Sequence, residues 1–206
     1  MKTIYILRHS IPDKTKYKKT PNELEKNKSI EIKEIKKAKE FFEKQEYKNI
    51  KNIYTSDYKR TIQTGKILNE NIKIDKRLGE RIAGTPNYEI TPQEYFYKQI
   101  KDENYKFKNG ESRKEIEERM YEAIIEILNK NDQAIIITHG ASLTFLLMKF
   151  CNVEITNIQN KIRKITFKNK KIFENKINYL ETFKLIFNEK NELIEIKSIG
   201  GLNENI

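Results

Sequence analysis

The amino-acid sequence predicts an α/β protein with three layers (α/β/α), in which helices cover both faces of a mostly parallel central sheet. Two observations support this fold class. Short runs of β-branched and aromatic residues alternate with amphipathic stretches from residue 2 to residue 150, as in strand–helix–strand units. Residues 161–198 instead hold strand-like runs without helices between them, and we expect antiparallel C-terminal strands at one edge of the sheet.

The first half of the chain is expected to contain three strands and two helices. A helix over 29–46 is predicted because Ile35, Ala38 and Phe42 recur at helical spacing among lysines and glutamates. The other elements, in chain order, are a strand over 2–7, a polar loop over 10–28, a strand over 50–54, a helix with Ser56 as its N-cap and a short strand near 72–75.

The segment 84–110 is the longest irregular stretch and is rich in aromatic residues. We expect one domain over 1–206, in which this segment forms a lid or insertion. The alternative is that its tyrosines, such as Tyr95 and Tyr97, pack onto the domain. The later elements are a helix that a Ser112–Glu115 capping box begins and that runs to about 129, a strand over 134–138, a helix over 142–150, and strand-like runs over 162–167, 179–187 and 193–199.

The composition indicates a folded protein with a basic surface. The net charge of +11 comes mainly from lysines that are spread along the whole chain, and no nucleic-acid-binding motif accompanies them. This pattern favours attraction of anionic substrates over nucleic-acid binding. Only seven of the 41 basic residues are arginine, so each arginine indicates a place where a planar bidentate donor is needed.

Cysteine usage and hydropathy point to a reducing, aqueous compartment. The single cysteine, Cys151, excludes an internal disulfide and a cysteine-based zinc site, and we expect it in the core. No stretch approaches the ~20 apolar residues of a membrane span. We therefore expect a cytoplasmic protein that does not bind membranes.

The two histidines occupy equivalent positions in the predicted sheet. His9 closes the apolar run 4–7 after Arg8, and His139 closes the run 134–138. Each imidazole is therefore expected where a strand passes into a loop, which is the edge at which α/β proteins bind ligands. Gly140 follows His139 and permits a close approach of the backbone to a ligand.

Three further side chains suited to phosphate follow predicted strands. Arg8 ends the first strand, and Arg60 falls on the first turn of the helix after 50–54, where free N–H groups attract anions. Glu80 follows the strand near 72–75, where repulsion by a bound phosphate would hold its carboxyl protonated for general-acid work. A parallel sheet would bring all of these groups to one edge.

Five short motifs follow one another over residues 2–150. They are Arg8-His9-Ser10; Ser56, Arg60, Thr61, Gln63 and Thr64; Leu78, Glu80, Arg81 and Gly84; Gly110-Glu111-Ser112; and His139, Gly140, Ser142 and Leu143. In this order they resemble the R-H-G, S-x-x-x-R-[AT]-x-Q-T, L-x-E-R-x-x-G, G-E-S and H-G-x-S-L motifs of the histidine phosphatase superfamily, which has the phosphoglycerate-mutase-like fold. Each motif alone is weak, but the ordered set is specific.

The resemblance implies a phosphomonoester hydrolase that acts on a small phosphorylated metabolite through a phosphohistidine. By that resemblance His9 takes up the phosphoryl group, and Glu80 protonates the leaving oxygen and then activates water. The groups that would hold the phosphate oxygens are Arg8, Arg60, His139 and Ser10. The resemblance implies neither a metal nor another cofactor. The residues alone leave open which histidine attacks.

Several positions depart from the family pattern. Ser10 replaces the usual glycine, and residues 11–14 lack the E-T-x-x-N that often follows R-H-G. Residues 85–109 contain no arginine and the chain has no tryptophan, which disfavours a bisphosphoglycerate-dependent phosphoglycerate mutase. The acid-phosphatase branch is disfavoured because Gly140, not aspartate, follows the second histidine. The mutase and a non-catalytic phosphate-binding module remain the alternatives, while a nucleic-acid-binding role rests on charge alone.

Overall fold

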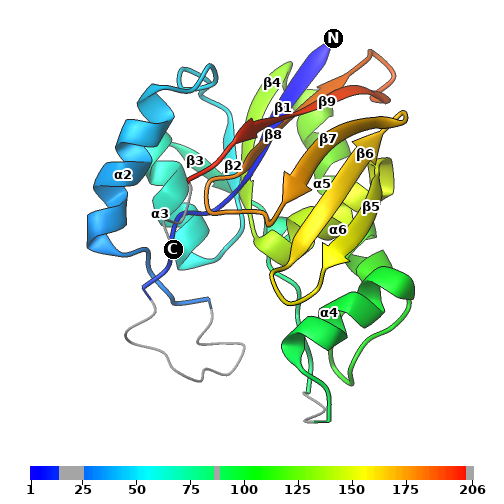
Figure 1. Cartoon of the computed structure of the whole chain (residues 1–206). Helices are drawn as coiled ribbons and strands as arrows, with labels where there is room; N and C mark the ends of the chain where they lie inside the picture. Colours follow the sequence, from blue (N-terminus) through cyan, green and yellow to red (C-terminus); the bar gives the residue numbers. More distant parts are fainter. Residues whose placement is uncertain (14–25, 86–88, 203–206) are drawn as a thin grey trace.

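Six strands form the central sheet in the computed structural model, which describes residues 1–13, 26–85 and 89–202 (Figure 1). The strand order is β3-β2-β4-β1-β8-β9. Four strands are parallel to one another: β1 (Lys2–Arg8), β4 (Gln133–Thr138), β2 (Ile53–Thr55) and β3 (Ile72–Ile74). Two antiparallel strands extend the sheet beyond β1: β8 (Thr182–Phe187) and β9 (Leu193–Gly200). The predicted fold class is confirmed.

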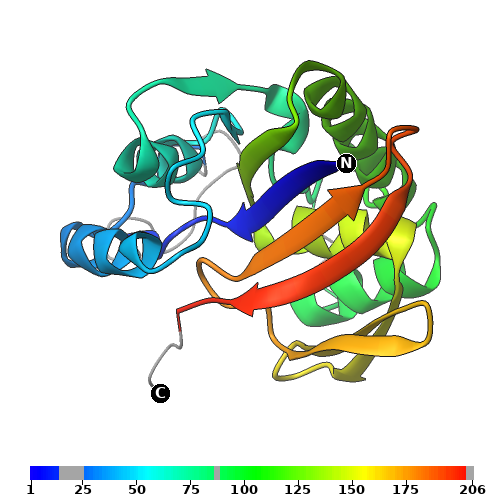
Figure 2. The ribbon, with the colours of Figure 1, turned by 90° about the horizontal axis from the view of Figure 1, so that it is seen from above.

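Helices cover both faces of this sheet (Figure 2). One face carries α2 (Ile32–Glu43) and α3 (Lys59–Leu68), and the other carries α5 (Arg113–Lys130) and α6 (Gly140–Phe150). The alternation of side chains along β1 explains the two cores. Ile4 and Ile6 join the core under α5 and α6, whereas Tyr5 and Leu7 join the core under α2. Burial of each such side chain contributes about 1.5–3 kcal/mol.

A second, three-stranded antiparallel sheet corrects the prediction for the C-terminal region. It consists of β5 (Asn152–Asn157), β6 (Ile162–Phe167) and β7 (Lys170–Asn175), in that order. The run 162–167 was predicted to pair at the edge of the central sheet, but it pairs with its sequence neighbours. The reason is local: Lys168 and Asn169 both adopt positive φ and form a tight hairpin. The strands β5 and β7 escaped detection because polar residues interrupt their apolar positions.

The segment 84–110 is not irregular throughout, as we had expected. It contains α4 (Pro92–Lys101), which begins with a capping box between Thr91 and Glu94. Pro92, which looks like a helix breaker, stands at the first helical position, where proline is well tolerated. The ends of the segment meet closely, because an added Cβ on Gly84 or Gly110 would lie under 3.0 Å from the opposite backbone. Residues 86–88 lie outside the described residues.

The remaining predictions need smaller adjustments. The capping box of Ser112 and Glu115 begins α5 as predicted. The run 179–187 becomes a strand only from Thr182, since Leu180 has a positive φ. Residues 14–25 of the predicted loop over 10–28 lie outside the described residues. Cys151 is buried in the core. No helix in the described ranges has the length and apolar character needed to cross a membrane.

Candidate active site

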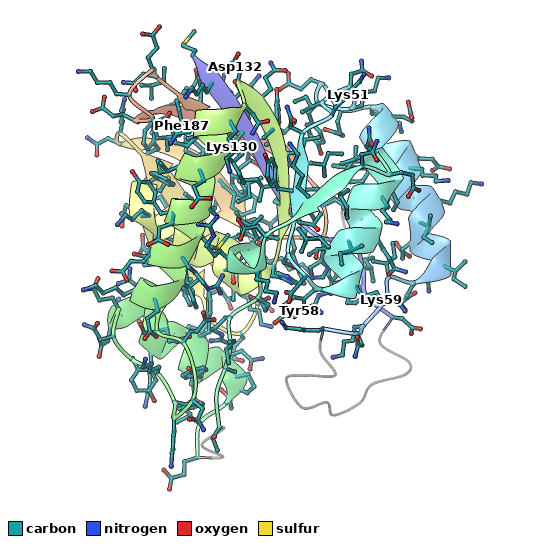
Figure 3. All side chains as sticks on the ribbon, turned by 180° about the vertical axis from the view of Figure 1, so that it is seen from behind. Lys51, Tyr58, Lys59, Lys130, Asp132 and Phe187 are labelled. Atoms are coloured by element: carbon teal, nitrogen blue, oxygen red, sulfur yellow. The ribbon has the colours of Figure 1, made fainter. Side chains whose placement is uncertain are left out.

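The two histidines meet because β1 and β4 are parallel neighbours. Arg8 and Thr138 are paired in register at the strand ends, so His9 and His139 follow directly, and their ring centroids lie 5.1 Å apart. Figure 3 shows Tyr58, at the start of α3, near this edge, with Lys130 and Asp132 at the opposite edge of the molecule. The prediction that both histidines stand at strand ends is confirmed.

His9 is held in a single tautomer. Its Nδ1 lies 2.6 Å from the carbonyl oxygen of Ser10, which can only accept a hydrogen bond, so Nδ1 carries the proton. Its Nε2 accepts a hydrogen bond from Arg60 Nε at 3.0 Å. The His9 ring is 4% exposed. Nε2 therefore keeps its lone pair, as a nucleophile requires.

Arg60 joins the two rings. While its Nε contacts His9, its second terminal nitrogen (Nη2) donates to His139 Nδ1 at 3.1 Å. The guanidinium also lies over the ring of Tyr58, 4.7 Å from its centroid, and is almost completely buried. Arg60 sits on the first turn of α3, as predicted from the sequence. One planar cation is thus directed at both imidazoles.

His139 adopts the opposite tautomer. Its Nδ1 accepts from Arg60, so Nε2 carries the proton and donates to Ser56 Oγ at 2.8 Å. Ser56 was predicted to cap the following helix, and this prediction is wrong: α3 begins at Lys59 without a side-chain cap. The Ser56 hydroxyl accepts from the histidine, while its own proton lies toward Thr61 Oγ1 at 2.7 Å. Ser56 therefore orients His139.

The rest of the Ser56–Thr64 motif also orients the site. Thr64 Oγ1 accepts from the backbone N–H of Ser10 at 3.1 Å and donates to the Arg60 carbonyl. Gln63 Oε1 accepts from the N–H of Ile30 at 2.8 Å and so anchors the chain before α2. The motif thus links α3 to the loop that follows β1.

Arg8 lies against the start of α6. Its guanidinium donates to the carbonyl of Ile177 at 2.7 Å and stacks 3.8 Å from the ring centroid of Tyr179. A Cβ on Gly140 would lie 3.3 Å from Arg8 Nε, so the glycine leaves room for this side chain. Arg8 Nε is buried and has no hydrogen-bond partner among the described residues. The hydroxyl of Ser10 is also buried and has no hydrogen-bond partner among the described residues.

Glu80 lies on the rim of the site. Its Oε1 accepts from the backbone N–H and the hydroxyl of Ser142, both at 3.2 Å, and from the Arg81 N–H at 2.9 Å. Arg119 of α5 donates to the carbonyls of Gly79 and Glu80 and holds this turn in place. Glu80 is thereby fixed next to the first turn of α6.

Burial and positive charge keep both histidines neutral. The pKa of His9 is lowered well below its usual value by desolvation, then by the charges of Arg60 and Arg8. The pKa of His139 is lowered well below its usual value by the same burial, with Arg60 as the largest charge. An anion bound here would reverse this effect and favour protonation.

A cavity of about 260 Å³ opens next to these groups. Arg8, Glu80 and Gly140 line its inner end. Its outer walls come from α4 and from the small sheet, and their side chains are Arg81, Pro92, Gln93, Phe96, Tyr97, Ile155, Ile158, Lys161, Arg163 and Lys176. Tyr97 therefore lines the cavity, whereas Tyr95 is buried at 2% exposure and stacks on Phe107. The lid over this cavity stays a prediction, since Tyr97 contributes to a wall and Tyr95 packs within the segment itself.

Sequence reasoning missed several residues around the site. Arg119, Tyr179 and Arg163 belong to no motif that we recognised. One signal could have found two of them, because arginine is scarce in this lysine-rich chain. Five of its seven arginines lie at the site or line the cavity: Arg8, Arg60, Arg81, Arg119 and Arg163.

The family is shown by comparison with known proteins. The model of the histidine phosphatase superfamily (branch 1) matches residues 4–175. The chain therefore belongs to the histidine phosphatase superfamily, and the resemblance inferred from the motifs is confirmed. Membership in this superfamily indicates a phosphatase or a related enzyme.

Solved structures share the fold over nearly the whole chain. A mycobacterial glucosyl-3-phosphoglycerate phosphatase in complex with VO3 superposes with a TM-score of 0.67 at 15% identity, covering 98% of this chain and 100% of that one. The same phosphatase with inorganic phosphate gives a TM-score of 0.65 at 15% identity, covering 98% and 97%. Bacillus stearothermophilus YhfR gives 0.64 at 18% identity, covering 98% of each chain. At these identities the likeness concerns the fold alone.

Proposed function

We propose that the protein hydrolyses phosphomonoesters of small metabolites through a phosphohistidine on His9. The observation that carries this proposal is the fixed tautomer of His9. Its Nδ1–H is engaged by the Ser10 carbonyl, and its Nε2 lone pair faces the Arg60 guanidinium. Because its lowered pKa keeps the ring neutral, this nitrogen needs no deprotonation before it attacks.

In the first step the incoming phosphate accepts the hydrogen bond that Arg60 Nε donates to His9 Nε2 in its absence. The freed Nε2 lone pair then forms a bond to phosphorus, and the bond from phosphorus to the ester oxygen breaks. Negative charge develops on the three phosphoryl oxygens. Arg60 and Arg8 supply fixed positive charge beside His9, and Ser10 adds a buried hydroxyl without a partner among the described residues. A bound dianion raises the pKa of His139, which then takes a proton from solvent on Nδ1 and becomes a further donor to the phosphoryl oxygens.

Glu80 is suited to the proton transfers. It lines the cavity together with Arg8, and its Oε1 is held by Ser142. A protonated Glu80 gives its proton to the leaving alkoxide. The resulting carboxylate then takes a proton from water, whose oxygen attacks phosphorus and breaks the N–P bond.

Trapping of the phosphoenzyme tests this mechanism and decides which histidine attacks. Wild type, His9→Ala and His139→Ala are mixed with labelled p-nitrophenyl phosphate and quenched in alkali, in which phosphohistidine is stable. We expect label on wild type and on His139→Ala at reduced turnover, and no label and no hydrolysis with His9→Ala. Label that persists in His9→Ala and disappears in His139→Ala would reverse the two roles.

The same preparation separates the alternatives. Phosphate binding in calorimetry without hydrolysis of p-nitrophenyl phosphate or any metabolite phosphate would indicate a binding module. Conversion of 3-phosphoglycerate that depends on 2,3-bisphosphoglycerate, with little hydrolysis of simple esters, would indicate a mutase.

A further inference from the structure

The outer half of the cavity carries positive charge that phosphoryl transfer does not use. Arg163 is the second residue of β6, Lys161 immediately precedes that strand, and Lys176 immediately follows β7. Arg81, directly after Glu80, lines the same cavity. Among the described residues that line this cavity, Glu80 is the only acid. The outer wall thus concentrates four cations, and none of the described residues that line it is acidic.

Arg163 is the most unusual of these cations. It is only 5% exposed, its Nε has no hydrogen-bond partner among the described residues, and none of its nitrogens forms an ion pair there. Its guanidinium lies near the ring of Phe96, 5.7 Å from the centroid. Burial and the charge of Arg8 lower its pKa to about 10, so it is still charged at neutral pH. A buried charge without a partner is costly unless an anion compensates it.

The cations that line the cavity repel one another electrostatically. The pKa of Lys161 is lowered by desolvation and then by Arg8, Arg163, Arg81 and Lys176, which are the other four cations of the cavity. Arginines elsewhere in the chain behave differently. Arg77 pairs with Asp75 and Glu126, and Arg113 pairs with Glu117.

This cluster is separate from the groups proposed to hold the transferred phosphate. Those groups stand at the ends of the parallel strands and in α3, whereas Arg163 and Lys161 come from the small antiparallel sheet. Apolar side chains share the outer walls with them, including Phe96, Ile155 and Ile158. The cavity runs from Arg8 and Glu80, beside the histidines, to this cluster, so a molecule that fills it can present one anionic group at each end.

We propose that Arg163, Lys161 and Arg81 form a second anion subsite, and that the substrate is a small phosphomonoester with a second anionic group, a carboxylate or a further phosphate. This inference rests on the proposed phosphatase function. Arg81 can offer the ligand only part of its guanidinium, because one of its terminal nitrogens (Nη1) already donates to Gln99 at 2.6 Å. Arg163 therefore makes the main contact, and the exposed Lys161 adds a second cation.

The test uses two esters that differ only at the second group. 3-Phosphoglycerate has a carboxylate at the position where glycerol 3-phosphate has a neutral hydroxymethyl group. Fructose 1,6-bisphosphate and fructose 6-phosphate form the corresponding phosphate pair. Wild type is expected to favour the doubly anionic member of at least one pair in kcat/KM. Arg163→Met is expected to reduce this preference on the order of 10–100-fold, the usual effect of a hydrogen bond to a charged group.

Two further variants protect the test against misfolding and against general charge effects. Lys161→Met removes an exposed ammonium and should reduce the preference about 3–10-fold without burying a new group. Lys164→Met is the matched control, since the alternation along β6 places Lys164 on the other face of the same strand. An unchanged preference in both Arg163→Met and Lys161→Met, or an equal loss in Lys164→Met, would overturn the subsite.

Binding separates this proposal from the proposed function. If wild type hydrolyses neither ester, calorimetry with 3-phosphoglycerate and glycerol 3-phosphate still measures the contribution of the carboxylate. Tighter binding of 3-phosphoglycerate that Arg163→Met abolishes would support the subsite although the phosphatase proposal had failed. Equal binding of the two esters to wild type and Arg163→Met would refute the subsite whatever the catalytic result.

Discussion

The inner and outer ends of the cavity differ in how their charges are satisfied. At the inner end every ring nitrogen of the two histidines has a hydrogen-bond partner, and Arg60 is shared between them. At the outer end Arg163 is equally buried but its Nε has no partner among the described residues. The histidine pair is organised before a ligand arrives, as transition-state stabilisation requires, whereas Arg8 Nε and Ser10 Oγ at the same end are buried without a partner among the described residues. The outer end has charge whose partner must come from the ligand.

The two ends also arise from different parts of the fold. The inner groups follow parallel strands, whose carboxyl ends converge at one edge of the sheet. The outer groups come mainly from the three-stranded antiparallel sheet and from α4. Both elements are remote in sequence from β1. A change in the outer elements can therefore alter the accepted ligand while the inner elements keep their geometry.

The largest effect that can break this comparison is expected from Arg60→Lys. A lysine keeps the charge, but a single ammonium cannot reproduce contacts to His9 Nε2 and His139 Nδ1. We expect kcat for p-nitrophenyl phosphate to fall about 10²–10³-fold, as when one transition-state donor is removed. Lys59→Gln, next to it on the exposed side of α3, is the control and should keep wild-type kcat. A kcat of Arg60→Lys within tenfold of wild type would mean that charge alone suffices.

The sequence predicted the inner end well for a physical reason. Each inner group directly follows a short apolar run, and parallel pairing then determines its neighbours, so His9, His139 and Arg60 could be placed together without any tertiary information. The role of Ser56 was misassigned because a serine before a helix satisfies a free N–H equally well in local terms. Only the position of His139 on the neighbouring strand decides between the two partners.

The outer end could not be predicted in the same way. Arg163 lies in a strand whose pairing depends on the hairpin at Lys168 and Asn169, not on its own hydrophobic pattern. Its burial depends on Phe96, which lies 67 residues earlier in a helix that the sequence did not reveal. The scarcity of arginine marked the residue as unusual, but it did not identify its surroundings.

The two tyrosines of α4 are expected to affect different properties, Tyr95 the stability of the fold and Tyr97 the substrate specificity at the outer end of the cavity. Tyr95→Ala removes a buried ring that stacks on Phe107 with centroids 3.9 Å apart, and should lower the free energy of unfolding by about 3–5 kcal/mol. Tyr97→Ala removes a ring from the cavity wall and should change the relative kcat/KM values across a substrate panel. Urea unfolding and the panel measure the two effects. Reversed results, with specificity altered only in Tyr95→Ala, would contradict the proposed role of α4 as a wall or lid.

Acid should destabilise the inner end before it affects the outer end. The folded-state pKa values of His9 and His139 lie well below the usual 6.5, so the unfolded chain binds protons that the folded chain does not. The free energy of unfolding is therefore fully retained above about pH 6.5 and falls below it, by up to about 1.4 kcal/mol per pH unit for each histidine.

Urea titrations between about pH 7 and pH 5 test this expectation. Replacement of His9 or His139 by asparagine should remove the contribution of one histidine to the slope of the free energy of unfolding against pH in that window. Burial raises the pKa values of Glu117 and Glu181, which oppose the histidine effect as the pH falls, so the difference between wild type and each histidine variant isolates the histidine contribution. An equal pH slope in wild type and both histidine variants would show that the folded-state pKa values of the histidines are not lowered.

The smallest effect is expected from Ser56→Ala, which removes the acceptor of the His139 Nε2–H without touching any charged group. The ring then loses one restraint on its tautomer while Arg60 still contacts Nδ1. Loss of one buried hydrogen bond corresponds to about 1–3 kcal/mol, so kcat should fall roughly 10-fold. Imidazole nitrogen shifts in NMR should show a second tautomer of His139 in the variant, whereas His9 keeps its own. A 10-fold loss of kcat with unchanged His139 shifts would locate the role of Ser56 in the loop that joins β2 to α3.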